Sequence, residues 1–323
     1  MGERKRVPPY LLQTEGNGMT ATPSKKMVKY NRAETRTAWL CLLPSVIGLV
    51  CITYLPMIAS FALSLFSWNG LGPMKFVGLD NYVKLFTNDS KFYGSLWTTL
   101  QYAGMSVILS IIYSMIIALL LNRKIPARGF FRAIFYLPYV LPAMAVYLGW
   151  KWLYDFNHGF FNYVVKLLGG APIKFLDSSA LVTPSLAFIA VWLSGNLIVI
   201  FLAGLQNVPR TYHEAAEIDG ANAWQRFWKI TIPCMTPIIF YNLLMSLVSN
   251  LQVITPALSL TKGGPGTGSY YMCYMLYQQA FKSHKYGYGS AVAVILFILI
   301  AIFTAILFAT SKGWIFYEGD DRE

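Results

Sequence analysis

Residues 96–121 read LWTTLQYAGMSVILSIIYSMIIALLL and contain no Asp, Glu, Lys or Arg. A helix needs about 20 predominantly apolar residues to cross the hydrocarbon core of a bilayer, so this stretch is long enough to cross it. Five further stretches are similarly apolar, and Lys151, near the end of the third stretch, is the single charged residue among them. The six apolar cores are residues 38–66, 96–121, 133–153, 181–205, 235–260 and 288–310. The sequence therefore predicts an all-α integral membrane protein with six transmembrane helices.

The composition of the whole chain agrees with a membrane protein. Of its 323 residues, 56% are hydrophobic and 12% are charged, whereas a soluble chain is roughly 45–50% apolar and about 25% charged. The net charge of +12 is also found in nucleic-acid-binding proteins. Here, however, Lys and Arg form short clusters between apolar runs and are not gathered to meet phosphates. Soluble and nucleic-acid-binding classes are therefore excluded.

The distribution of Lys and Arg predicts the orientation. Seventeen lie in the N-terminal tail, in the connections after the second and fourth spans and at the C-terminus, against nine in the other three connections. Because cytoplasmic connections carry the excess of positive charge, both termini should be cytoplasmic. We expect a partly disordered tail at 1–37, a six-helix transmembrane domain at 38–310 and a C-terminal tail at 311–323. The first span is longer than the apolar core of a signal peptide, so we expect it to be retained.

Residue patterns for catalysis or metal binding do not occur. His158, His213 and His284 fall in three different connections, so no metal-ligand spacing such as HExxH exists. The glycine-rich residues 263–269, GGPGTGS, lack the Lys of a phosphate-binding P-loop. The spans contain no carboxylate to relay protons. We expect no catalytic residue, cofactor or metal in this chain, and a driving force that lies in another chain.

The connection after the fourth span, residues 209–220 or PRTYHEAAEIDG, predicts a helix of about two turns outside the membrane. Thr211 followed by Glu214 is a capping-box pattern, and Gly220 can end the helix with a positive φ. Acidic and small residues alternate along it: Glu214, Ala215, Ala216, Glu217 and Asp219. Small side chains permit close approach of another surface. A docking helix and a solvated surface helix fit these residues equally well.

The spacing within and after this segment resembles the EAA signature of the membrane subunits of binding-protein-dependent ABC importers. Glu214-Ala215-Ala216 is followed after three residues by Gly220, after nine more by Ile230, and then by Pro233. Ile232 stands where the family usually has Leu, a conservative departure. In that family this loop forms a coupling helix that inserts into a cleft of the cytoplasmic ATPase. The resemblance thus implies an ATPase-coupling role for residues 214–217, Asp219 and Gly220.

Four other stretches, residues 76–82, 132–138, 202–209 and 260–265, resemble the carbohydrate branch of these importers, the maltose-permease-like subunits. The resemblance covers nearly all of residues 38–310. It implies a permease subunit that moves an oligosaccharide across the bacterial cytoplasmic (inner) membrane by alternating access. The implied partners are a second permease subunit, a solute-binding protein and a dimer of ABC ATPase subunits. ATP and Mg would be bound by those ATPases, because this chain has no Walker motif.

Polar residues recur in two spans. Asn242, Ser246, Ser249 and Asn250 are spaced i, i+4, i+7 and i+8 on the fifth, and Trp192 and Asn196 lie one turn apart on the fourth. Amides in hydrocarbon are costly unless paired, so these side chains should face protein or water. Hydrogen bonding between helices is one interpretation. The resemblance places Trp192, Asn196, Ser246 and Asn250 at the family's sugar-contacting positions, which implies a substrate path.

The outer connections carry nine Lys against four Asp. This excess would attract an acidic uronate oligosaccharide, or match an acidic surface of a binding protein. The charge of the cargo therefore stays open. A different functional class, a channel or secondary transporter that works alone on a small polar solute, also fits a six-span protein; a membrane enzyme is a more distant reading.

Overall fold

The computed structural model describes residues 32–316, with side chains from residue 36 onward. The chain divides into two compact units, Met1–Leu55 and Pro56–Glu323, which are described separately. Most of the predicted tail at 1–37, and the end of the tail at 311–323, lie outside the described residues.

The described part of the first unit is helical. It comprises α1 (Arg32–Gly48) and the π-helical turns of η1 (Leu49–Tyr54), and α2 (Leu55–Leu63) follows directly. Residues 36–63 form one helix of 28 residues that is long and apolar enough to cross a membrane. It closely matches the first expected span. Most of its large hydrophobic side chains are exposed, as expected for a helix surrounded by lipid or other subunits.

The second unit begins at Pro56, within α2, and continues into a short antiparallel hairpin of β1 (Phe66–Ser67) and β2 (Lys75–Phe76), in which Phe66 pairs with Phe76. The rest of its described part is helical. The elements are α3 (Asp80–Thr87), α4 (Phe92–Asn122), α5 (Arg128–Val140), α6 (Ala143–Leu153), α7 (Phe160–Leu167), α8 (Val182–Trp192), α9 (Gly195–Asn207), α10 (Arg210–Ile218), α11 (Ala223–Arg226), η2 (Phe227–Thr231), α12 (Ile232–Leu251), η3 (Ala257–Thr261), α13 (Met272–Tyr277), η4 (Gln278–Lys282) and α14 (Tyr286–Ser311).

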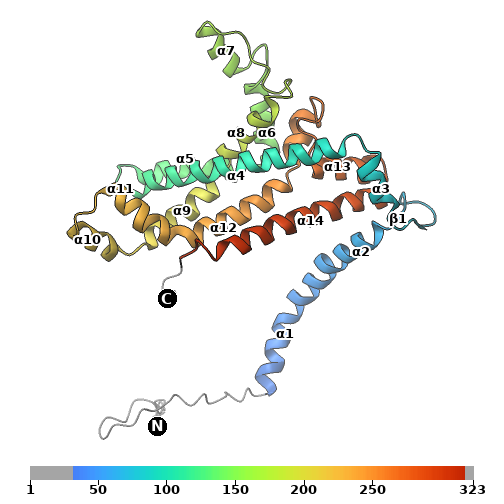
Figure 1. Ribbon diagram of the computed structural model, residues 1–323, viewed down its shortest axis with the longest axis horizontal. Coiled ribbons are helices and arrows are strands. Elements are labelled where there is room, and N and C mark those ends of the chain that lie inside the picture. The colour runs from blue at the N-terminus through green and yellow to red at the C-terminus, as the bar shows by residue number, and fades with distance from the viewer. Residues whose placement is uncertain (1–31, 317–323) are drawn as a thin grey trace, which may run out of the picture. The chain divides into compact units, whose positions relative to one another are not determined.

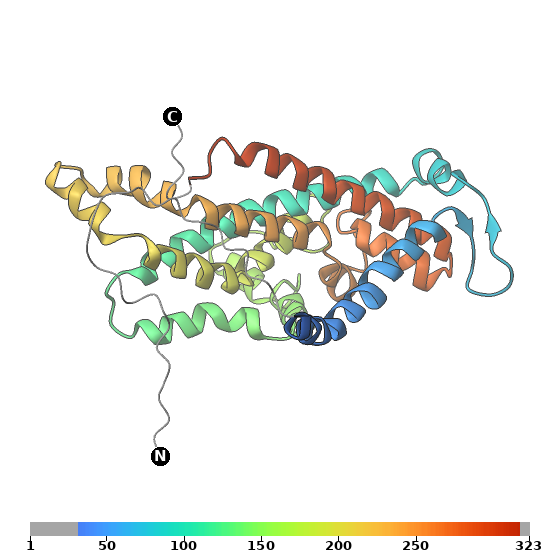
Figure 2. The same ribbon diagram turned by 90° about the horizontal axis from the view of Figure 1, so that it is seen from below.

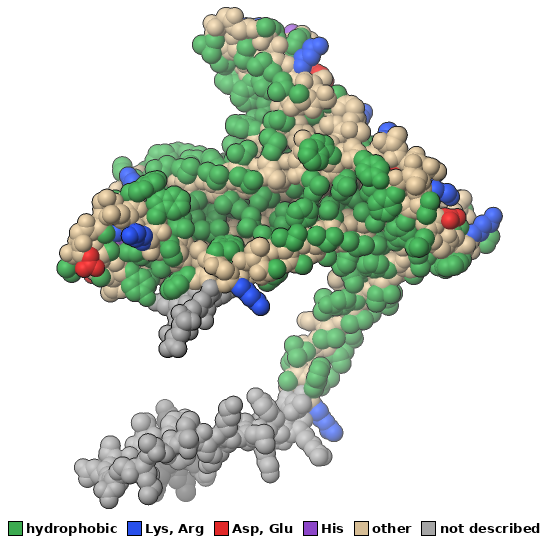
Figure 3. Space-filling view, viewed as in Figure 1, with side chains coloured by type: hydrophobic (Ala, Val, Ile, Leu, Met, Phe, Trp, Pro, Cys, Tyr) green, Lys and Arg blue, Asp and Glu red, His purple; other side chains and the backbone are tan. Residues whose placement is uncertain are grey.

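The long helix α4 organises this bundle. It packs against α8, α9 and α12, and α12 packs in turn against α14. Figures 1 and 2 show α4, α12 and α14 running along the same direction, with α10 and α11 at one end of the bundle and the β1–β2 hairpin at the other. The middle of the face in Figure 3 is covered by hydrophobic side chains, and its charged side chains lie toward the ends. This distribution suits a bundle whose middle is surrounded by lipid.

The buried face of α4 carries its Ser and Thr residues together with Phe92 and Tyr102, and its exposed face carries large aliphatic residues. Its buried residues include Ser95, Thr99, Ser106, Ser110 and Ser114, whereas Ile108, Leu109, Ile112 and Ile116 are exposed. In a membrane, apolar side chains gain nothing by leaving lipid for protein, and small residues let helix backbones approach closely. The stretch that predicts the fold is therefore a lipid-facing helix with a tightly packed inner face.

Two of the six expected spans are bent. Four helices are long and apolar enough to cross a membrane, or up to six if each bent pair is one span, within the described residues. α5 and α6 turn by 98° at Leu141–Pro142, and α8 and α9 turn by 49° at Leu193–Ser194. Pro142 lies at the first break, whereas Pro138 lies inside α5. The second break was not predicted.

The expected bounds of the fifth span were wrong. The core was placed at residues 235–260, but the helix runs from Ala223 to Leu251 through α11, η2 and α12. It begins earlier because Asn222 caps it. It ends earlier, at Leu251, and the chain continues through the exposed Gln252 toward η3. A membrane helix can end within an apolar run when neighbouring groups satisfy the backbone.

Candidate functional site

The helix α10 occupies the connection that carries the EAA spacing (Figure 1). It begins at Arg210, and its N-cap is Pro209 with an extended backbone. Thr211 therefore lies inside the first turn, and no side chain caps the helix. The predicted capping box of Thr211 and Glu214 is wrong. The proline keeps Val208 before it extended, and the helix starts directly after the proline, one residue before Thr211.

The end of α10 follows the prediction. Gly220 has a φ of 80°, in the left-handed region that glycine adopts without steric cost. The N–H of Ala221 donates to the carbonyl of Ala216 at 2.8 Å, and the N–H of Gly220 donates to the carbonyl of Glu217 at 3.0 Å. These two bonds form a Schellman motif, which satisfies the last carbonyls of a helix. The motif fixes the point at which the chain turns toward α11.

The short helix α11 is tied to α10. Asn222 and Gln225 form a capping box, in which each side-chain oxygen accepts from the other residue's N–H at 2.9 Å. Arg226 forms an ion pair with Glu217 of α10. An ion pair on an exposed carboxylate adds little stability. It does, however, set the direction of the Glu217 carboxylate relative to the membrane helix that follows.

Nearly all predicted coupling residues are exposed. Glu214, Ala215, Glu217, Asp219 and Gly220 are exposed, and Ala216 is half-buried. The structure adds three large apolar side chains that the sequence analysis missed. Ile218 is 87% exposed at the end of α10, and Trp224 and Trp228 are 70% and 51% exposed. Trp224 and Trp228 lie between the fourth and fifth spans expected from the sequence, and their size could have indicated this apolar surface. Trp224 and Trp228 lie in the first turns of the long helix Ala223–Leu251, whereas Ile218 lies outside the spans. A large apolar side chain exposed at such a position is typical of a surface that another protein covers.

The predicted polar stripe lies on α12, and its members differ in burial. Asn242 and Ser246 are buried, whereas Ser249 is exposed. Asn250 is half-buried, and its amide donates to the carbonyl of Ser246 at 2.8 Å. Neither amide atom of the fully buried Asn242 has a hydrogen-bond partner among the described residues. Since an unpaired buried polar group costs about 1–3 kcal/mol, Asn242 would gain most from a polar ligand entering the bundle.

The break between α8 and α9 is supported by neighbouring helices. Ser194 Oγ lies 2.9 Å from Ser114 Oγ of α4, within hydrogen-bonding distance. Side chains of this kind satisfy the groups that a break exposes in a membrane helix. At Gly195, a Cβ atom would lie 2.7 Å from the carbonyl oxygen of Phe135 on α5. Glycine is therefore required for the close contact of α5 and α9.

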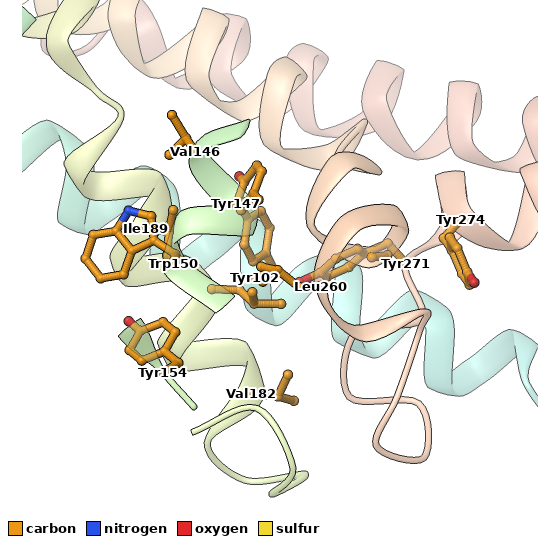
Figure 4. Close-up of a cluster of buried hydrophobic side chains, with 12 residues drawn as sticks. Tyr102, Val146, Tyr147, Trp150, Tyr154, Val182, Ile189, Leu260, Tyr271 and Tyr274 are labelled. Atoms are coloured by element: carbon orange, nitrogen blue, oxygen red, sulfur yellow. The ribbon is translucent and has the colours of Figure 1, made fainter. Parts of the chain in front are cut away.

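Trp192 and Asn196 lie on opposite sides of this break. The Trp192 ring makes an edge contact with Trp150, with ring centroids 5.5 Å apart, and remains 37% exposed. Asn196 is half-buried on α9, which packs against α12. Trp150 belongs to a buried aromatic cluster (Figure 4) with Tyr102, Tyr147, Tyr154, Tyr271 and Tyr274. Aromatic packing thus holds Trp192 while more than a third of its surface stays accessible.

A hollow of about 1060 Å³ lies at the end of the second unit opposite α10, beside the β1–β2 hairpin and α3. Its lining includes four lysines, Lys75, Lys84, Lys91 and Lys285, and one acidic residue, Asp89. The Tyr288 hydroxyl donates to the Asp89 carboxylate at 2.8 Å. The hollow therefore has a positive excess, as predicted for the outer connections.

No group of three His, Cys, Asp or Glu side chains within residues 32–316 is placed to hold a metal ion. Of the acidic residues of α10, Glu217 is already engaged by its ion pair with Arg226.

Comparison with known proteins agrees with this geometry. Residues 110–312 match the family model of the binding-protein-dependent transport system inner membrane component. The chain is 36% identical to the probable ABC transporter permease protein YesP of Bacillus subtilis, over 95% of this chain and 99% of that protein. It is also 36% identical to the multiple sugar-binding transport system permease protein MsmF of Streptococcus mutans, over 85% of this chain and 94% of that protein.

The fold is also found in a solved transporter. A chain of a bacterial ABC transporter involved in the import of the acidic polysaccharide alginate superimposes with a TM-score of 0.75 at 22% identity. The alignment covers 87% of this chain and 96% of that chain. The two chains therefore share a fold.

Proposed function

The chain belongs to the family of binding-protein-dependent transport system inner membrane components, and from this premise we propose that it is the permease subunit of an ATP-driven oligosaccharide importer. The multiple-sugar permease among its relatives supports a carbohydrate cargo. The proposed assembly contains a second permease subunit, a dimer of ABC ATPase subunits and a solute-binding protein that delivers the cargo. ATP and Mg bind to the ATPases, and this chain carries no catalytic residue.

The proposed topology has six spans with both termini in the cytoplasm. Each bent helix pair counts as one span in this arrangement, which gives the upper number that the helix lengths allow. The excess of Lys and Arg in the connections on the α10 side supports a cytoplasmic location for that end. The lysine-lined hollow then faces the periplasm or the exterior, where a binding protein arrives.

We assign the role of coupling helix to α10. The observation that carries this assignment is Ile218, whose side chain is 87% exposed among the acidic residues of a helix outside the spans. An apolar side chain so exposed favours burial against another protein, and the neighbouring carboxylates add charge selectivity. In this proposal the ATPases close on ATP and then reopen, and both movements displace α10. The membrane helices that are continuous with α10 then open the cargo cavity to one side of the membrane and afterwards to the other.

Exchange of charge on α10 tests this assignment. Glu214→Lys should leave membrane insertion intact, because the side chain is exposed, and should abolish co-purification of the ATPase or transport-coupled ATP hydrolysis. The control is Lys124→Glu, a charge exchange at an exposed position of another connection on the same side. Transport by Glu214→Lys in cells that lack the ATPase gene would show that the chain works alone, as a channel or secondary transporter.

We further propose that the cargo passes the break between α8 and α9 and the stripe of α12. Trp192 would stack on a sugar ring, and the amides of Asn196, Asn242 and Asn250 would pair with its hydroxyl groups, joined by Ser246 and Ser249. The accessible surface of Trp192 and the unpaired amide of Asn242 support this path. Asn250→Leu should weaken sugar uptake without loosening the assembly with the ATPase. Unchanged uptake would mean that the stripe only packs the bundle.

An acidic uronate oligosaccharide is the cargo that the outer hollow favours. Its four lysines would attract carboxylates, and such steering weakens as salt screens it. Uptake of a uronate oligosaccharide should therefore fall more steeply with ionic strength than uptake of a neutral oligosaccharide of equal length. Equal salt dependence would assign the lysines to contact with the binding protein.

A further inference from the structure

The start of α5 lies at the same end of the bundle as α10 (Figures 1 and 2) and is strongly basic. Residues 122–132, NRKIPARGFFR, contain four Lys and Arg and no acidic residue. Ala127 adopts a φ of 54° before the helix, and no side chain caps the helix start. The partial positive charge of a helix N-terminus adds to the side-chain charges at this position.

Two arginines of α5 meet above the end of α9. Arg128 and Arg132 lie one turn apart, so their side chains leave the same face of the helix. With the Gln206 amide oriented to satisfy its neighbours, its oxygen accepts from Arg132 Nη2 at 2.9 Å and from Arg128 Nη2 at 3.1 Å. Two guanidinium groups thus share one neutral acceptor.

This pair of charges has no counter-ion in the described part of the chain. The ion pairs found there, those of Asp155 and Glu217, involve neither arginine. The Nε atoms of both arginines are buried without an acceptor. Like charges held together in a partly desolvated place repel each other strongly, and a buried charge is tolerated when it is paired. An anion from beyond the described part of the chain would therefore stabilise this arrangement.

The surface beside the arginines is apolar. A cavity of about 160 Å³ between α5 and α9 is lined by Arg132 and Gln206 and by Tyr136, Ile198, Val199 and Leu202. Tyr136 and Val199 are exposed, so the cavity opens on the surface of the bundle. Phe130, Phe131 and Ile134 are also exposed on α5. The two arginines match the anionic headgroup of a phospholipid, and the apolar groove beside them matches its acyl chain.

We propose that Arg128 and Arg132 bind the phosphate of an anionic phospholipid, whose acyl chain enters the groove between α5 and α9. Basic pockets between helices on the cytoplasmic side are suited to such headgroups, and guanidinium groups match phosphate geometry through paired donors. The remaining Nη–H groups donate to the phosphate oxygens, while Gln206 holds the two arginine side chains together. The site goes beyond cargo transport, and the leaflet it occupies follows from the proposed topology.

Lipid retention by the intact importer tests the site. The complete complex is purified in mild detergent, and bound phosphatidylglycerol and cardiolipin are counted by native mass spectrometry, which requires no transport activity. Arg128→Gln/Arg132→Gln should bind anionic lipid roughly thirtyfold more weakly than the unaltered chain. The matched control is Arg123→Gln/Lys124→Gln, which removes the same charge from exposed positions of the same connection and should retain most of the lipid.

Three outcomes would overturn the proposal. Equal lipid loss from the two double variants would reduce the effect to general surface charge. Loss of the second permease subunit, with lipid unchanged, would mean that a carboxylate of that subunit is the counter-ion. In nanodiscs of phosphatidylcholine, added phosphatidylglycerol should raise the thermal unfolding temperature of the complex, and added inorganic phosphate should not. Stabilisation by inorganic phosphate but not by phosphatidylglycerol would exclude a lipid-specific site.

Discussion

Replacement of Ile218 by Ala separates the stability of the fold from the docking of α10. The side chain is 87% exposed within the chain, so little packing is lost. At about 0.8 kcal/mol per fully buried methylene, loss of its three extra carbons should change the free energy of unfolding by about 0.3 kcal/mol. Full burial of the same carbons against an ATPase subunit is worth about 2.4 kcal/mol, so the affinity for that subunit should fall about fiftyfold.

The assay titrates the ATPase subunits against the pair of permease subunits in nanodiscs and records binding, with thermal unfolding measured in parallel. Leu71→Ala is the matched control, since Leu71 is 81% exposed in the β1–β2 connection at the other end of the bundle. It should leave ATPase affinity unchanged. Equal affinity of Ile218→Ala and the unaltered chain, or an equal loss in Leu71→Ala, would refute the assignment of α10 as a docking helix.

Two glycine substitutions test local geometry. Gly195→Ala should destabilise the bundle by about 1–3 kcal/mol and lower the thermal unfolding temperature, because the added carbon meets the backbone of α5. The control is Gly104→Ala on α4, which has nothing within 4 Å of the added carbon and should not lower the unfolding temperature. Equal effects of the two substitutions would contradict this packing. Gly220→Ala should destabilise the end of α10 by about 1–2 kcal/mol, because position 220 has a positive φ, and should lower the stimulated ATPase activity of the complex. Asn tolerates a positive φ, so Gly220→Asn should retain more of that ATPase activity. Equal activity of the two variants would show that the Schellman motif is unimportant for coupling.

Hydropathy located the apolar stretches well but could not show how they bend. Residues 96–121 and 288–310 coincide closely with α4 and α14, because long uncharged runs leave little choice other than helix in a bilayer. The end of α12 at Leu251 lies inside an apolar run. The break at Ser194 depends on a hydroxyl of α4, which is distant in the sequence. A helix end or break that depends on contacts with residues distant in the sequence leaves no signal in the local sequence.

The candidate site shows the same limit. The spacing around Gly220 predicted both the helix and its end, because a left-handed glycine is a local requirement. The start of the helix was misplaced, since Pro209 determined it and not Thr211. The Asn222–Gln225 capping box was visible in the sequence but was overlooked. The exposure of Ile218 depends on how α10 is held against α11, which no periodicity encodes.

The central claim is that α10 receives mechanical work from a separate ATPase on the cytoplasmic side. The most direct measurement places a single cysteine by Ile218→Cys, in a chain whose native cysteines, Cys41, Cys51, Cys234 and Cys273, are replaced by Ser. The account predicts that a bifunctional thiol reagent joins position 218 to the ATPase subunit, and that an impermeant maleimide added outside the cell does not label it. Labelling from outside, or the absence of any ATPase adduct in the assembled complex, would contradict the account.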